Sequence, residues 1–207
     1  MDHFFQVRDV FNKGAGLYEE KYMDISPYHQ SLDVVLERLP QRAEVLDVGC
    51  GPGNISRYLI THQPHLRVLG IDIAPRMLEL AARNNPTAEY QLLDCRDIVK
   101  LNKIFDGIVC GFVLPYLSTS EICTFIKEAK TLLSPGGIVY VSFMEGRYAD
   151  SGWVTSATGS SLYICYHEPQ WISEVFQLEG FLEIFSETID PAPGSSASDV
   201  VSVYQLL

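Results

Sequence analysis

The sequence contains little positive charge. Its 15 Lys and Arg residues are outnumbered by 26 Asp and Glu residues, and the formal net charge is −11. An acidic surface repels the phosphate backbone of nucleic acids, and the basic residues form no run that would offset this repulsion. This composition argues against nucleic acid as a partner.

Long apolar runs are absent as well. A membrane-spanning helix needs about 20 consecutive apolar residues, and no stretch of this sequence is that long, so we expect no membrane association. The first residues, Met1 to Phe5, show no basic segment followed by an apolar one. A secretion signal is therefore not expected there.

The five cysteines lack the patterns of a disulfide framework or a zinc site. Their number is odd and no two form a Cys-x-x-Cys pair. Reduced thiols in a cytoplasmic protein are the simplest interpretation. The acidic residues also show no convincing metal-ligand spacing, and we expect no metal.

The apolar content suffices for one globular core. Of 207 residues, 47% are hydrophobic, which is ample for one domain and short for two. We expect a single domain over residues 1–207. Its expected parts are an N-terminal helical cap (1–40), a cofactor-binding core (43–144), a lid insertion (145–167), and a helix with a closing hairpin (168–207).

Strand and helix patterns alternate from residue 43 onward. Short apolar runs predict strands over 44–48, 67–71, 88–93, 105–110 and 138–143, and helical patterns predict helices over 54–61, 75–83 and 120–133. This alternation indicates a parallel sheet with helices on both faces. Two further strands, over 181–188 and 199–204, have no helix between them and must be antiparallel neighbours.

Two segments outside this alternation carry their own expectations. Near the N-terminus, residues 12–16 (Asn-Lys-Gly-Ala-Gly) are expected to break a first short helix, and Ser26 is expected to cap a helix that begins at Pro27. Residues 146–159 are rich in Ser, Gly, Thr and Ala. We expect them to form a long loop or small insertion of the kind that often acts as a lid.

A glycine-rich turn follows the first predicted strand. Gly49, Gly51 and Gly53 lie between the strand and the next helix, where glycines let a ligand approach the backbone closely. A P-loop is excluded because no lysine follows the glycines. A dinucleotide loop would need Gly or Ala where Asn54 stands, so that match is imperfect.

The segment Asp47-Val48-Gly49-Cys50-Gly51-Pro52-Gly53 resembles the first motif of class I S-adenosylmethionine-dependent methyltransferases. The resemblance covers about residues 43–143 and extends more weakly to the closing hairpin. It implies an α/β, Rossmann-like three-layer sandwich with a seven-stranded, mostly parallel sheet, an N-terminal helical segment and a lid insertion after the fifth strand. It also implies S-adenosylmethionine as cofactor, S-adenosylhomocysteine as product, and methyl transfer to a small-molecule acceptor.

The resemblance carries over to individual positions. Asp72, which ends the second strand, is expected to accept hydrogen bonds from the ribose hydroxyls, as an acid at this position also does in dinucleotide enzymes. Ile73 is expected to pack on the adenine, and Asp94 and Cys95 to contact its edge. The full set expected at the cofactor is Tyr22, Asp47, Gly49, Cys50, Gly51, Asp72, Ile73, Met77, Asp94, Cys95, Cys110 and Gly111.

The acceptor side offers fewer signals. His167 is a candidate general base, with a structural or capping role as its alternative. The expected substrate or lid residues are Tyr18, Tyr116, Trp153, Tyr163 and Tyr166. Two other functions stay open: a cofactor-binding sensor or inactive subunit, and an NAD(P)-dependent reductase, although the Tyr-x-x-x-Lys pattern of one reductase class is absent.

Overall fold

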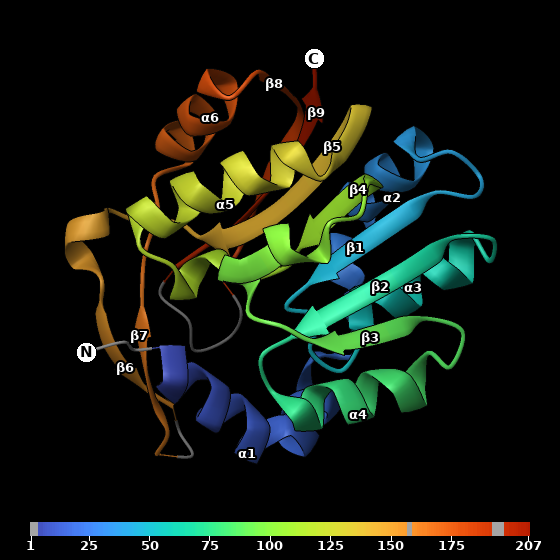
Figure 1. Ribbon diagram of the computed structural model, residues 1–207. Helices are drawn as coiled ribbons and strands as arrows, with labels where there is room; N and C mark the ends of the chain where they lie inside the picture. Colours follow the sequence, from blue (N-terminus) through green and yellow to red (C-terminus); the bar gives the residue numbers. More distant parts are fainter. Residues whose placement is uncertain (1–3, 157–158, 192–196) are drawn as a thin grey trace.

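A seven-stranded sheet forms the centre of the molecule. The structure is a computed structural model that describes residues 4–156, 159–191 and 197–207. The sheet order is β3-β2-β1-β4-β5-β9-β8 (Figure 1). Its strands are β1 (Glu44–Val48), β2 (Arg67–Asp72), β3 (Glu89–Leu92), β4 (Phe105–Cys110), β5 (Leu133–Met144), β8 (Phe181–Ile189) and β9 (Asp199–Leu206).

The pairing confirms the predicted topology. Strands β1 to β5 pair in parallel, and β9 is antiparallel to both β5 and β8. β1 pairs with β2 on one side and β4 on the other, so the strand order reverses at β1. In open α/β sheets, ligands bind beside such a reversal, outside the carboxyl ends of the strands.

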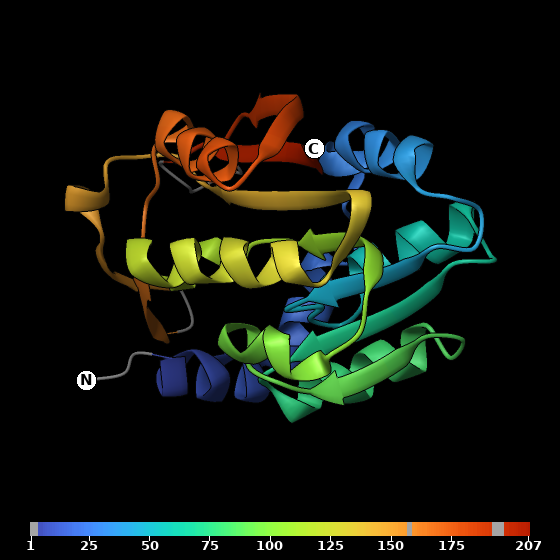
Figure 2. The same cartoon turned by 45° about the horizontal axis from the view of Figure 1, so that its top comes forward.

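Helices cover both faces of the sheet. They are α1 (Phe4–Tyr22), α2 (His29–Arg38), α3 (Asn54–His62), α4 (Pro75–Asn84), α5 (Thr119–Thr131) and α6 (Pro169–Leu178). Figures 1 and 2 show α5 and α6 on one face and α2 and α3 on the other. Neighbouring β1 residues divide between the two apolar cores: Leu46 packs in the first and Val45 in the second. The result is a three-layer sandwich whose central strands are buried on both faces.

Helix α1 runs without interruption through residues 12–16, so the predicted break is wrong. Ala15 packs with Ala74 and Met77 in a small apolar cluster, and α1 lies beside α4 (Figures 1 and 2). Each glycine in a helix costs about 1 kcal/mol relative to alanine. Burial of the α1 face against α4 offsets that cost.

The predicted cap at Ser26 is also wrong. Residues Ser26–Tyr28 form a short 3-10 turn (η1), and α2 begins after it at His29. The backbone N–H of Ser26 donates to the carboxylate of Asp24 at 2.9 Å, and the Ser26 side chain caps nothing. Asp24 therefore shapes this turn in place of the serine.

Of the two forms expected for the segment after β5, a long loop or a small insertion, the structure has a small insertion that contains a hairpin. A 3-10 turn, η4 (Tyr148–Asp150), precedes β6 (Gly152–Thr155) and β7 (Ser161–Ile164), which pair antiparallel. Figure 1 shows the hairpin beside the N-terminal half of α1, where the Gln6 side chain donates to the backbone carbonyl of Ser161 at 3.0 Å. Residues 157–158 of the expected loop lie outside the described residues.

Two remaining 3-10 turns, η2 (Cys95–Leu101) and η3 (Leu114–Tyr116), follow β3 and β4. Within the described ranges, no helix is long and apolar enough to cross a bilayer.

Candidate functional site

The glycine turn after β1 lies at the strand-order reversal. Gly49 has a φ of +63°, a conformation that favours glycine. A Cβ on Gly49 would lie 2.3 Å from Cγ2 of Val113, so a side chain has no room there. The turn therefore needs glycine both for its conformation and for its close approach to the segment after β4.

The buried side chain of Asp47 connects the strand before this turn to the helix after it. Its carboxylate Oδ2 accepts hydrogen bonds from the backbone N–H of Ser56 at 3.1 Å and from the Ser56 hydroxyl at 2.6 Å. Asp47 is almost fully buried, and burial raises its pKa to about 7 even though the bonds from Ser56 act in the opposite direction. The side chain ties the end of β1 to the first turn of α3.

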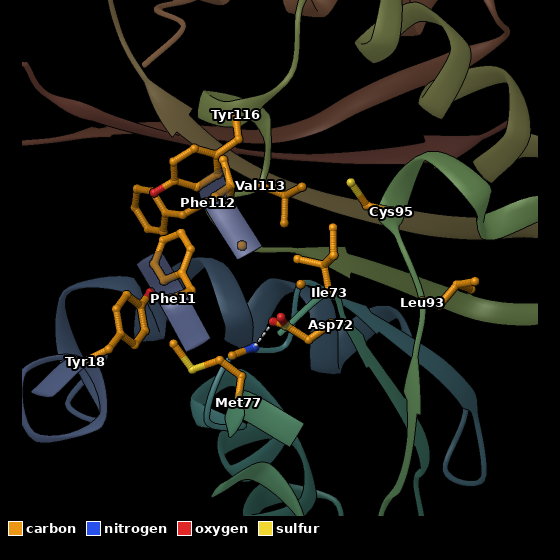
Figure 3. Close-up of a pocket in the computed structure, with 14 residues that line it drawn as sticks. Phe11, Tyr18, Asp72, Ile73, Met77, Leu93, Cys95, Phe112, Val113 and Tyr116 are labelled. Carbon is orange, nitrogen blue, oxygen red and sulfur yellow. Dashed lines mark hydrogen bonds between the residues drawn. The ribbon is translucent and has the colours of Figure 1, made fainter. Parts of the chain in front are cut away.

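Asp72 stands at the end of β2, next to the glycine turn. Its Oδ2 accepts from the backbone N–H of Gly51 at 2.9 Å (Figure 3). Its Oδ1 accepts from the N–H of Ala74 at 2.8 Å. Burial raises the pKa of Asp72, and hydrogen bonds from the backbone N–H groups of Ala74, Gly51 and Ile73 limit that rise. A carboxylate has about four lone-pair sites, so the side chain can still accept from a further donor.

The first pocket lies between α1 and the carboxyl ends of the strands (Figure 3). The empty space in and around it, open solvent at its mouth included, is about 580 Å³. The rings of Tyr18 and Tyr116 each lie 5.5 Å from that of Phe11, in edge-to-face contact. The lining residues are Val7, Phe11, Tyr18, Gly49, Gly51, Asp72, Ile73, Met77, Leu93, Cys95, Gly111, Phe112, Val113 and Tyr116.

A second, larger pocket adjoins the first. The two share six lining residues: Tyr18, Gly49, Gly51, Gly111, Phe112 and Tyr116. Beyond these, the second pocket is lined by Lys21, Tyr22, Asp24, Ile25, Tyr28, Asp47, Cys50, Asn54, Ile55, Tyr140, Met144, Val154 and Asp199. Tyr28 donates its hydroxyl to Oδ2 of Asp199 at 2.7 Å.

Phe112 borders both pockets in a strained conformation. Its φ is +54°, which is rare for a bulky residue. Its backbone N–H donates to the Ser142 hydroxyl at 2.9 Å, and its ring meets that of Tyr28 edge-to-face at 5.4 Å. Such strain persists only where the surroundings hold it, and it gathers at functional sites.

Most of the residues expected at the cofactor line these pockets. Seven of them line the first pocket: Gly49, Gly51, Asp72, Ile73, Met77, Cys95 and Gly111. Tyr18 and Tyr116, expected at the substrate or lid, line it as well. Tyr22, Asp47 and Cys50 line the second. Cys110 lines neither pocket and is completely buried at the end of β4.

Asp94 also lines neither pocket. Its carboxylate forms an ion pair with Arg96 at 2.7 Å and accepts from the Arg96 backbone N–H at 2.9 Å. It thereby caps η2, and its neighbours Leu93 and Cys95 line the first pocket in its place.

His167 is not brought to either pocket. It is buried between Tyr148 and Trp171, whose rings each stack at 6.0 Å from its own, and its Nε2 lies 3.1 Å from the carbonyl oxygen of Leu114. Burial lowers its pKa. This placement favours the structural alternative for His167, which joins the insertion to the segment after β4.

The predicted lid aromatics also lie away from the pockets. Trp153 and Tyr163 face each other across the β6–β7 hairpin with ring centroids 5.7 Å apart. Tyr166 lies against Gly146. The hairpin contributes Val154 to the second pocket instead.

Several lining residues were missed by sequence reasoning. In the first pocket they are Val7, Phe11, Leu93, Phe112 and Val113, and in the second they include Ile25, Tyr140, Met144 and Asp199. Most are apolar residues with no distinguishing pattern. Within the described ranges, no three His, Cys, Asp or Glu side chains gather as metal ligands would.

The fold and pocket define an α/β protein with a pocket at the strand-order reversal, and the comparisons with known proteins show what the chain resembles. Residues 45–137 match the family model of a methyltransferase domain. Trans-aconitate 2-methyltransferase of Variovorax paradoxus (strain S110) is 30% identical over 109 residues, 53% of this chain and 41% of that protein. Putative methyltransferase YqeM of Bacillus subtilis (strain 168) is 30% identical over 135 residues, 63% and 53% respectively. The chain thus spans about half the length of the curated relatives it matches.

A solved structure extends the likeness to the whole chain. Burkholderia thailandensis 1,6-didemethyltoxoflavin-N1-methyltransferase, solved with 1,6-didemethyltoxoflavin and S-adenosylhomocysteine bound, aligns with a TM-score of 0.74 and 18% identity. The alignment covers 100% of this chain and 90% of that one. At this identity the likeness establishes the fold. Residues 45–137 are similar to a methyltransferase domain, and the rest of the chain completes a Rossmann-like methyltransferase fold.

Proposed function

We propose that the chain binds S-adenosylmethionine in the first pocket and transfers its methyl group to a small molecule in the second. The observation that carries this proposal is the hydrogen bond to Asp72, which lines the first pocket, from Gly51, which lines both of two adjoining pockets. One pocket is suited to a nucleoside, and the other supplies a separate space for an acceptor.

The residues of the first pocket fit the cofactor. The buried Asp72 carboxylate has lone pairs left for the ribose hydroxyls, and Ile73 and Met77 offer an apolar surface for the adenine. Gly49, whose missing side chain opens the turn, lies where the methionine part would pass. Asp94 acts indirectly in this proposal, by capping η2 and so fixing Cys95 against the pocket.

The protein's contribution to methyl transfer is alignment and exclusion of water. When bound, S-adenosylmethionine supplies a methyl group on a positively charged sulfur that leaves as a neutral thioether. Tyr18 and Tyr116 border both pockets and restrict the passage between them. Helix α1 covers the first pocket through Phe11 and Tyr18 (Figure 3). Holding the reacting atoms in line in this way is itself a large part of catalysis.

The wider setting is part of the same proposal. One sheet joins β1 to β5 with β8 and β9, and of the described strands only those of the β6–β7 hairpin lie outside it. This supports one domain over residues 1–207 with the parts expected from the sequence. The five cysteines are free, which supports a cytoplasmic location. The relatives' names refer to small molecules and to a carrier-bound malonyl group, which supports a small-molecule acceptor, and the acidic composition argues against nucleic acid.

Titration calorimetry tests the proposal. We expect S-adenosylhomocysteine to bind at about micromolar level, an ordinary affinity for a cofactor site, and NADH not to bind. Binding of NADH without binding of S-adenosylhomocysteine would replace the proposal with the reductase. If S-adenosylhomocysteine binds but no labelled methyl group reaches any member of a broad acceptor panel, the chain is a cofactor-binding sensor.

A further inference from the structure

The second pocket combines aromatic rings with carboxylates. Six of its lining residues are aromatic: Tyr18, Tyr22, Tyr28, Phe112, Tyr116 and Tyr140. Asp24 and Asp199 add carboxylates, with Asp47 deeper at the end of β1. The single lysine in the lining, Lys21, is exposed at the rim and lies over the Tyr22 ring at 4.8 Å. The pocket therefore presents negative charge and ring faces.

Asp199 is half-buried without a cationic partner. It begins β9, opposite Met144 of β5 and Ile189 of β8. In the part of the chain that the structure describes, Tyr28 alone donates a hydrogen bond to it, and no Lys or Arg pairs with it. Burial raises the pKa of Asp199, which means that its ionised form is short of solvation. A cation bound beside it would supply what the protein does not.

We propose that the acceptor of this methyltransferase is an amine, and that Asp199, oriented by Tyr28, holds its amino group in the second pocket. The inference rests on the proposed function, because it names the substrate class of the same site. A carboxylate that keeps Oδ1 for a donor, next to several aromatic faces, matches the chemistry by which proteins bind ammonium groups.

The charge balance of the reaction favours the same assignment. The bound ammonium group first loses a proton to solvent. The lone pair of the neutral amine nitrogen then forms the new N–C bond while the C–S bond breaks and its electron pair stays on sulfur. Positive charge therefore moves from sulfur to nitrogen, and the methylated product is an ammonium ion that later loses a proton to solvent. A carboxylate near the nitrogen stabilises the charge where it develops.

A carboxylate acceptor fits this pocket poorly. Its negative charge would face Asp199 and Asp24, and like charges repel strongly where solvent is scarce. A neutral alcohol can donate a hydrogen bond to Asp199, but it carries no positive charge that the carboxylate would attract. The three acceptor classes are therefore expected to bind in a definite order.

Three soluble probes of nearly equal size separate these classes: tyramine, tyrosol and 4-hydroxyphenylacetate. They are titrated at pH 7 into protein saturated with S-adenosylhomocysteine, with binding followed by NMR or calorimetry. We expect tyramine to bind at least about tenfold more tightly than tyrosol, as one charge-assisted hydrogen bond provides, and 4-hydroxyphenylacetate to bind most weakly. In Asp199→Asn the preference for tyramine over tyrosol should fall to about threefold or less.

Asp190→Asn is the matched control, because Asp190 is exposed just after β8 and lines neither pocket. It should keep the wild-type preference. Tyr28→Phe should give an intermediate preference, because Asp199 then loses its orienting donor. Both pocket variants should bind S-adenosylhomocysteine within twofold of wild type, which shows that they fold.

Two results would overturn the amine assignment: tyramine failing to bind more tightly than tyrosol, or the preference persisting in Asp199→Asn. A labelled methyl group that reaches alcohols or carboxylates in an acceptor panel, but no amine, would also overturn it. Failure of the wild type to bind S-adenosylhomocysteine is a different outcome, which removes the proposed function itself.

Discussion

The carboxylate of Asp72 accepts a hydrogen bond from the backbone N–H of Gly51 across 2.9 Å. This bond joins the end of β2 to the glycine turn after β1, and it places a buried negative charge at the first pocket. Asp94, at the end of β3, has its carboxylate turned to Arg96. A ligand in the first pocket can therefore contact the carboxylate of Asp72 but not that of Asp94.

We expect Asp72→Ala to weaken S-adenosylhomocysteine binding by about tenfold to a hundredfold, because hydrogen bonds to a charged group are lost. Asp94→Ala should weaken it by about threefold or less, since that side chain lines neither pocket. Calorimetry on both variants, with thermal unfolding as a check on folding, measures the contrast. Unchanged affinity in Asp72→Ala would remove Asp72 from the site.

The sequence predicts the features that depend on near neighbours. Gly49 was identified because a turn between a strand and a helix needs glycine, and Asp72 because strand ends share one edge of a parallel sheet. Asp47 followed from the resemblance of residues 47–53 to a known motif. The sheet topology followed from the alternation of patterns and from the two final strands with no helix between them.

Features made by distant segments were not predictable in this way. Tyr28 and Asp199 are 171 positions apart and meet only because β9 inserts between β5 and β8. The positive φ of Phe112 is imposed by contacts with Ser142 and Tyr28, and no local pattern announces it. The sequence left the role of His167 open between a base and a structural histidine, because its burial between two rings depends on the fold of the insertion.

Helix α1 shows the same limit and yields a prediction. A Cβ added to Gly14 or Gly16 would meet no atom within 4 Å. Gly14→Ala and Gly16→Ala should each raise the free energy of unfolding by about 0.5–1 kcal/mol, because alanine is the better helix former. Urea denaturation measures the change. Loss of stability in both variants would contradict a continuous, open-faced helix at this position.

Gly136→Ala is the control for that experiment. Gly136 also has open space around it, with only the Gln205 side chain at 3.9 Å, but its φ is +77°. Alanine there is strained by about 1–2 kcal/mol whatever the space. A gain in unfolding free energy for Gly14→Ala and a loss for Gly136→Ala would show that backbone conformation, and not the space around the side chain, decides the change in stability.

Asp47 gives the stability of the ligand-free protein a specific pH dependence. Its pKa is raised to about 7 in the folded state by burial, against an ordinary value of 3.8. Between these values the folded state keeps a proton that the unfolded state has lost. The contribution of Asp47 to stability is therefore full at low pH, declines as the pH rises toward 7, and is constant above it.

Asp47→Asn removes this titration and keeps an oxygen that accepts from Ser56. Between pH 5 and pH 8, we expect the wild type to lose about 2–3 kcal/mol more unfolding free energy than the variant, at about 1.4 kcal/mol for each pKa unit. Urea denaturation of both proteins at both pH values measures this difference. Equal losses would mean that Asp47 stays ionised when folded, and that its bonds from Ser56 outweigh the cost of burial.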